Sequence, residues 1–114
     1  MLKNDFEVRE VKNITNLDKQ RIEDFLQGAV YCWCKNNKDK WFALRDLMGG
    51  ENFDWRGTPL FNIYKKNEDK DNAISLTGKD MGWLLKKVIK NDQRYFDTKK
   101  EEMTRKYKWD NTKS

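Results

Sequence analysis

The hydrophobic period of this chain changes once between Thr77 and Trp109, and that change constrains the fold more than any other feature. Before the change, four apolar residues recur at the spacing of one helical face: Met81, Leu84, Leu85 and Val88. After it, apolar and polar residues alternate, and Tyr, Phe, Thr and Trp become frequent, as is typical of strands. The segment therefore predicts a helix near residues 77–91, capped by Thr77, and a hairpin at residues 94–109 with its loop at 100–103.

The side of the predicted helix opposite its apolar stripe is basic. At about 100° per residue, it places one aromatic ring among four cations: Lys79, Trp83, Lys86, Lys87 and Lys90. We expect the four apolar residues to be core and the tryptophan to be substantially exposed. An ordinary solvated helix face is also charged, so this face alone leaves solvation and binding open.

The net charge of the chain is +5, and all of it lies in the C-terminal part. Residues 77–114 hold eleven Lys and Arg against six Asp and Glu, whereas residues 1–76 hold thirteen of each. Six cations belong to the predicted hairpin: Arg94, Lys99, Lys100, Arg105, Lys106 and Lys108. A basic helix followed by a basic hairpin resembles the recognition helix and wing of a winged helix-turn-helix DNA-binding domain. The resemblance is to an architecture, and it implies phosphate contacts from both elements.

The remaining elements are read from caps and periodicity. Asp18 can cap a helix at residues 18–36, whose apolar residues repeat on one face: Ile22, Phe25, Leu26, Ala29 and Trp33. Thr58 followed by Pro59 indicates a second helix, at residues 58–67. Residues 41–44 are assigned to a short strand that pairs with the wing, followed by a helical turn at 45–48, and one continuous helix over 41–48 is the alternative. The connector after residue 67 is longer than in the compact helix-turn-helix motif.

At 114 residues the chain fits one domain, and we expect a partly ordered N-terminal arm at 1–15 followed by a globular domain at 16–110. The expected fold is mainly α with a small β-hairpin (α+β) and winged-helix-like, and an irregular small helical α+β domain is the alternative. No apolar run could span a membrane, and the first residues lack the apolar segment of a signal peptide, so a cytoplasmic protein is expected.

The chain offers little material for catalysis. It has no histidine, which removes the commonest general base, and its only cysteines, Cys32 and Cys34, diverge on a helix. Two divergent thiols without histidine make a poor zinc site. We therefore expect no enzymatic activity, no catalytic residues, no metal and no cofactor.

The least ordinary loop is residues 49–57, with sequence GGENFDWRG. Its two rings, Phe53 and Trp55, either pin the connection to the core or contact a ligand or partner. Asp54, Trp55 and Arg56 remain candidates for a protein contact, and it is open whether the loop is functional.

Two functions follow as hypotheses. The first is a non-enzymatic nucleic-acid-binding domain, in which the helix face and the wing contact phosphates, since the helix face has no Asn, Gln or Arg to read a base edge. Such a chain is compatible with a small regulatory or accessory protein of a phage or mobile element. The alternative is a protein-interaction module or inhibitor that sets exposed aromatics against an acidic partner. The partner, its target sequence, DNA against RNA, and the oligomeric state stay open.

Overall fold

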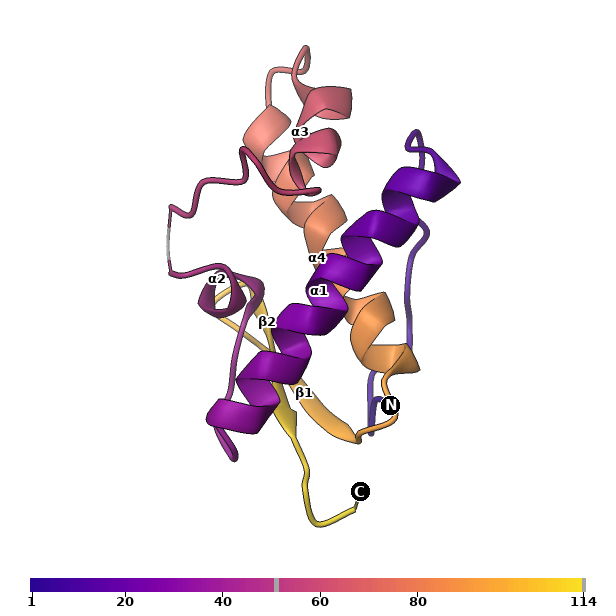
Figure 1. Ribbon diagram of the computed structural model, residues 1–114. Coiled ribbons are helices and arrows are strands. Elements are labelled where there is room, and N and C mark those ends of the chain that lie inside the picture. Colours follow the sequence, from indigo (N-terminus) through magenta and orange to yellow (C-terminus); the bar gives the residue numbers. More distant parts are fainter. Residues whose placement is uncertain (51, 114) are drawn as a thin grey trace.

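The computed structural model describes residues 1–50 and 52–113. Within them lie four helices followed by one antiparallel hairpin (Figure 1): α1 Asn16–Asn36, α2 Leu44–Leu47, α3 Phe61–Asn67, α4 Ala73–Asn91, β1 Phe96–Glu101 and β2 Thr104–Trp109. The fold class is the predicted one, mainly α with a small hairpin. The long helices α1 and α4 cross at the centre, α3 lies at one end, and the hairpin lies toward the other end (Figure 1).

Helix α1 begins two residues before the predicted start. Thr15, and not Asp18, is the cap, because the Thr15 Oγ1 accepts a hydrogen bond from the Asp18 amide at 3.0 Å. Its buried row follows a spacing of four: Ile22, Leu26, Val30 and Cys34. The buried face of α1 is therefore rotated slightly from the predicted one, because Phe25 and Trp33 lie at the edge of the core and are only partly buried.

Helix α4 begins four residues before the predicted cap. Thr77 lies inside it and is fully buried, with its hydroxyl donating to the Ala73 carbonyl at 2.7 Å. Its buried face is as predicted, since Met81, Leu84, Leu85 and Val88 are 1–4% exposed. The longer α4 shortens the connector from α3 to residues 68–72. Helix α3 begins at Phe61, later than the predicted start at Thr58. The Thr58 Oγ1 accepts a hydrogen bond from the Leu60 N–H at 3.2 Å and so caps a turn that precedes the helix.

The hairpin pairs Phe96 with Trp109 at its base and Glu101 with Thr104 at its tip. Its turn has two residues, Glu102 with φ 52° and Met103 with φ 63°, in place of the predicted four-residue loop. Two left-handed residues give the backbone twist that joins antiparallel strands tightly, although Asn-Gly is the usual sequence for it. Neither Glu102 nor Met103 is a typical residue of such a turn, so the sequence predicts a loop at 100–103 but not its two-residue form.

The predicted strand at 41–44 pairs with the wing, although at a single position. Phe42 and Tyr107 exchange both backbone hydrogen bonds, each at 2.8 Å. Their side chains enter the core with Phe96, and the Phe42 ring contacts both the Tyr107 ring and the Phe96 ring, at centroid distances of 5.9 and 6.3 Å. The predicted helical turn after this strand is α2.

The N-terminal residues pack against the domain more closely than an arm would. Leu2 forms a parallel bridge to Phe96, and both Leu2 and Val11 belong to the core at 6% and 4% exposure. The free edge of β1 explains this, because its unpaired backbone groups bind the N-terminal residues, with Phe96 N–H donating to the Met1 carbonyl at 2.7 Å. Among the described helices, none is both long and apolar enough to cross a membrane.

Candidate nucleic-acid interface

The predicted contact face of α4 is not an open basic surface. Lys86, expected at its centre, is 3% exposed, and its Nζ lies 2.8 Å from the Asp5 Oδ1. Its ammonium also lies 5.5 Å from the centroid of the Trp83 ring. The prediction that Lys86 faces solvent is therefore wrong, because the N-terminal segment lies across this side of α4.

Trp83 is also more buried than predicted. It is half-buried, packs against the hydrophobic core, and carries the Arg9 guanidinium 5.2 Å from its ring centroid. A groove of about 280 Å³ opens beside it. Residues of the N-terminal segment, α1 and α4 line the groove: Val8, Arg9, Glu10, Val11, Lys19, Trp83, Leu84, Lys87, Lys90 and Asn91.

The other lysines of the α4 face divide into two kinds. Lys87 pairs with Glu23 of α1 at 3.3 Å, and Lys19 across the groove pairs with Glu10 at 3.7 Å. Lys79 and Lys90 are exposed, and neither forms an ion pair within residues 1–50 and 52–113. Only these two of the four predicted lysines are therefore free to meet a ligand without breaking an existing contact.

Among the predicted wing cations, Arg94 has a structural role. It binds the buried Asp92, with Nε 2.9 Å from Oδ1 and Nη2 2.7 Å from Oδ2, and Gln27 of α1 donates to the same carboxylate at 2.8 Å. Burial opposes ionisation of Asp92, but the hydrogen bonds from Arg94 and Gln27 outweigh it and hold the pKa of Asp92 below its usual range. Arg94 ties α1 and α4 to the start of the hairpin.

The hairpin proper carries a mixture of paired and free cations. Lys99 and Lys106 lie opposite each other and share Glu101, at 3.1 and 2.9 Å, and both hold the pKa of Glu101 below its usual range through their hydrogen bonds. Arg105 binds Asp5, at 2.6 Å. Lys100 is exposed and has no ion pair in the described part of the chain.

The structure also brings together a group that the sequence analysis missed. Trp41 lies on the hairpin, with the Lys99 Nζ 4.2 Å and the Lys108 Nζ 5.3 Å from its ring centroid. Phe42 enters the core beside Tyr107, so its neighbour Trp41 lies on the outer face by strand alternation. We call the surface formed by Trp41, Lys99, Lys106 and Lys108 the Trp41 patch. The signal available in the sequence was this alternation, together with the flanking lysines 38 and 40, which are also exposed.

The loop residues proposed as a partner site have a structural role as well. Phe53 and Trp55 meet edge to face at 5.9 Å, Trp55 stacks on Tyr64 of α3 at 5.7 Å, and both loop rings pack on the core. Asp54 and Arg56 form an exposed two-point contact with each other, at 3.0 and 2.9 Å. The rings of Phe53 and Trp55 therefore hold the loop against the core.

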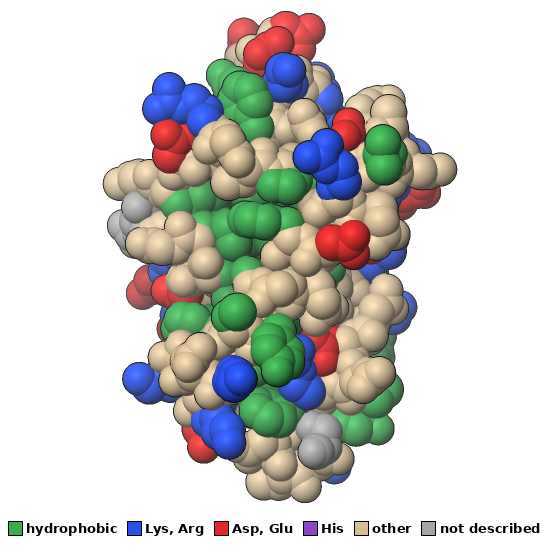
Figure 2. Space-filling model, viewed as in Figure 1, with side chains coloured by type: hydrophobic (Ala, Val, Ile, Leu, Met, Phe, Trp, Pro, Cys, Tyr) green, Lys and Arg blue, Asp and Glu red, His purple; other side chains and the backbone are tan. Residues whose placement is uncertain are grey.

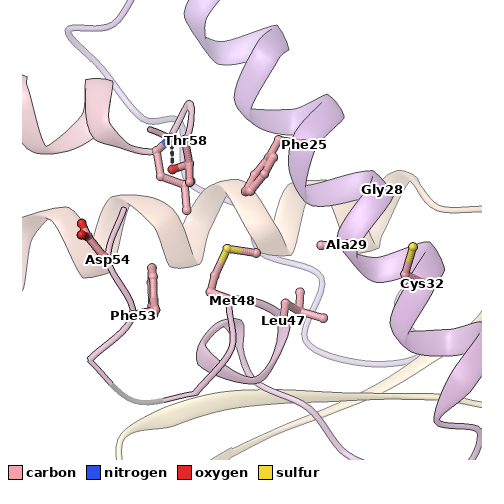
Figure 3. A pocket seen from close by; sticks show the side chains of 10 residues that line it. Phe25, Gly28, Ala29, Cys32, Leu47, Met48, Phe53, Asp54 and Thr58 are labelled. Atoms are coloured by element: carbon pink, nitrogen blue, oxygen red, sulfur yellow. Dashed lines mark hydrogen bonds between the residues drawn. The ribbon is translucent and has the colours of Figure 1, made fainter. Parts of the chain in front are cut away.

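A second hollow lies between α1, α2 and this loop. Its volume is about 340 Å³, and Phe25, Leu47, Met48 and Phe53 turn toward it (Figure 3). Gly28 lies on its α1 side, where an added Cβ would meet no atom within 4 Å. Hydrophobic side chains gather down the middle of the face drawn in Figure 2, over α1, α2 and the connection to α3.

No protein-family model, curated protein or solved structure matches this chain. Its function is therefore inferred from the geometry and charge of its own residues.

Proposed function

We propose that this protein is a non-enzymatic nucleic-acid-binding protein that contacts its ligand through the Trp41 patch. The observation that carries the proposal is the Trp41 ring lying within 4.2 and 5.3 Å of two lysine ammoniums on the outer face of the hairpin. Unlike Trp83, this ring is not packed against the core cluster. Although Trp41 is half-buried like Trp83, it combines an aromatic ring outside the core with cations on one face of the hairpin.

The chemistry of the Trp41 patch suits an unpaired strand better than a duplex. Lysines attract phosphates without reading sequence, and an indole ring stacks on any base. The patch has no Asn, Gln or Arg, the side chains that recognise base edges with two hydrogen bonds. We therefore infer binding to single strands with little sequence preference.

The charge distribution supports the same surface. The acidic connector between α3 and α4, with Glu68, Asp69 and Asp71, caps the end of the molecule farthest from the base of the hairpin (Figures 1 and 2). The hairpin and its flanking lysines lie toward the other end. Such polarity orients an approaching polyanion with the hairpin first.

The order of elements supports the resemblance to a winged helix, since α1 and a short strand precede α3, α4 and a hairpin that pairs with the strand, with the four-residue α2 as an additional helix after the strand. In that architecture α4 would be the recognition helix. Because the N-terminal segment covers α4, we assign the main contact to the hairpin and a smaller one to Lys79 and Lys90.

A second candidate, a protein-interaction module, is favoured by the hollow of about 340 Å³ beside Phe53. Its apolar lining suits an apolar side chain of a partner. Nothing in its charge selects an acidic partner, because Asp54 and Arg56 neutralise each other.

Fluorescence anisotropy with single-stranded and duplex oligonucleotides, DNA and RNA, tests the proposal. If the three lysines of the patch meet phosphates of a single strand, the log–log slope of affinity against salt should be about −2. Lys108→Glu should weaken binding, whereas Lys65→Glu should not, although Lys65 also lies over a ring, that of Phe61 on α3. A folded protein that binds none of these oligonucleotides at low salt would exclude this function and favour the interaction module.

A further inference from the structure

Asp5 joins two elements that are far from it in sequence. Its Oδ1 lies 2.8 Å from the Lys86 Nζ of α4, and its Oδ2 lies 2.6 Å from the Arg105 Nη2 of β2. The hydrogen bond from Lys86, together with the charge of Arg105, outweighs partial burial and holds the pKa of Asp5 below its usual range. One carboxylate thus occupies the meeting point of the helix and the hairpin.

Both cations have supports that do not depend on Asp5. Lys86 has a side chain only 4% exposed and lies 5.5 Å from the Trp83 ring, while the Arg105 Nη1 donates to the Thr98 Oγ1 at 3.3 Å. If the carboxylate moved away, the two positive charges would therefore stay close together. An anion position that exists before its ligand arrives binds that ligand with little loss of side-chain freedom.

A third donor, without a partner among the described residues, lies on the strand that carries Arg105. Tyr107 is 1% exposed, and in the described part of the chain its hydroxyl finds no hydrogen-bond partner. It points to the same face of β2 as Arg105, two residues away. Burial raises the pKa of Tyr107, while the nearby Arg105 charge lowers it and the Asp5 charge raises it. A buried hydroxyl left unpaired costs free energy, so such a donor points to a missing acceptor.

We propose that Lys86, Arg105 and Tyr107 form a phosphate-binding site between α4 and the hairpin, and that Asp5 fills this site in the structure described here. A carboxylate has two oxygens, and Asp5 uses one for each cation. A phosphate group has further oxygens, so it can bind both cations and also accept from the Tyr107 hydroxyl. The site therefore matches a phosphate more fully than it matches the carboxylate.

The segment that carries Asp5 lies on the surface, and its release would also break the hydrogen bond that the Asn4 amide donates to the Thr98 carbonyl at 3.1 Å. Buried Leu2 and Val11 anchor it on either side, whereas residues 4–7 are all exposed. Asp5 has φ 52°, a left-handed conformation in which glycine is unstrained. Residues 4–7 thus act as a strap that competes with phosphate for the site.

The phosphate could belong to a nucleic-acid backbone or to a free phosphorylated ligand. The first source rests on the proposed function, because it requires a strand already held at the hairpin. Inorganic phosphate tests the site itself, and an oligonucleotide tests the source, so the two ideas can fail separately.

Asp5→Gly empties the site at a backbone conformation that glycine tolerates. At a phosphate concentration about tenfold above its Kd, the melting temperature of this variant should rise by about 5 °C relative to chloride of equal ionic strength. The wild-type protein and the matched control Glu7→Gly, which loses an exposed carboxylate paired with Arg9, should show almost no shift. Adding Arg105→Gln to Asp5→Gly should abolish the shift. In the oligonucleotide titration, Asp5→Gly should steepen the log–log salt slope by about 1.4 for two newly available cations on a single strand.

If Asp5→Gly folds only when phosphate is present, the site is supported. If phosphate stabilises it no more than it stabilises Glu7→Gly, or if the variant stays unfolded in both salts, Asp5 is a structural residue and the proposal is overturned. A phosphate shift without a steeper salt slope would support the site and assign it to a free phosphorylated ligand.

Discussion

Trp83 and Trp41 each have two cations over the ring, Arg9 and Lys86 in the first case and Lys99 and Lys108 in the second, yet the two regions differ in what covers them. Trp83 packs against the core, and the lysine over its ring is buried and paired with Asp5. Trp41 lies outside the core cluster, and the lysines beside it stand on the outer face of a hairpin. A tryptophan among lysines therefore does not define a ligand surface by itself. Whether such a surface can bind a ligand depends on whether another segment of the same chain already covers it.

The lysines of the two regions also differ in how many of them are paired with a carboxylate. On α4, Lys86 and Lys87 each have a carboxylate from another segment, Asp5 and Glu23. On the outer hairpin face, Lys99 and Lys106 share Glu101, and Lys108 has no ion pair among the described residues. The lysine over Trp83 is therefore neutralised by a carboxylate of its own, whereas Lys108 beside Trp41 is not, and the lysines of α4 without an ion pair in the described part of the chain are Lys79 and Lys90.

The largest effect that separates the two regions should be on stability. Lys86→Glu would place a second carboxylate against Asp5 in a buried site, and it should lower the free energy of unfolding by about 3 kcal/mol. Lys79→Glu reverses one exposed charge on the same helix and should change it by less than about 0.5 kcal/mol. Urea denaturation of both variants measures the difference. Similar small effects would mean that the covered region is as open as the hairpin.

Alanine substitution of the two tryptophans should give opposite profiles. Trp83→Ala should cost about 2 kcal/mol of stability, less than a fully buried ring, and Trp41→Ala should cost under about 1 kcal/mol. Trp41→Ala should weaken single-strand binding by about 1–3 kcal/mol, the usual contribution of a stacked base, and should affect duplex binding less. Denaturation combined with anisotropy checks both. If Trp83→Ala lost binding with stability intact, the ligand surface would have to be moved back to α4.

Features that depend on local pattern were predictable from the sequence. The apolar row from Met81 to Val88 fixes the face of α4, and the change to alternation fixes the hairpin, because both periods follow from backbone geometry alone. The pairing of Phe42 with β2 was also predicted, from the expected order of elements. Helix starts were less accurate, since Thr15 and Asp18 are both good caps and only the surrounding chain selects one.

The candidate site was harder to predict because it depends on contacts between distant residues. Asp5 and Lys86 are 81 positions apart, and nothing in the pattern of α4 shows that one of its lysines is covered. A lysine on a helix face is normally solvated, and the sequence therefore predicted that Lys86 would be exposed. The Trp41 patch was not predicted for the same reason, because its lysines lie on strands more than fifty residues after Trp41 in the sequence.

The smallest of these effects should be seen in acid, and it separates buried from exposed carboxylates. The folded-state pKa of Asp92 is lowered, so its contribution to stability is present above its unfolded pKa and is lost as pH falls through the folded pKa. Asp92→Asn should therefore reduce stability at neutral pH and flatten its decline below about pH 5. Glu101 also has a lowered pKa, but it is solvent-exposed beside Lys99 and Lys106, so water and salt screen its pairing. Glu101→Gln should leave the acid decline unchanged, and thermal melts of both variants from pH 7 to pH 2.5 check this. An equal flattening by both substitutions would show that the lysines of the hairpin are held as firmly as Arg94, which would remove the reason for regarding them as free to bind.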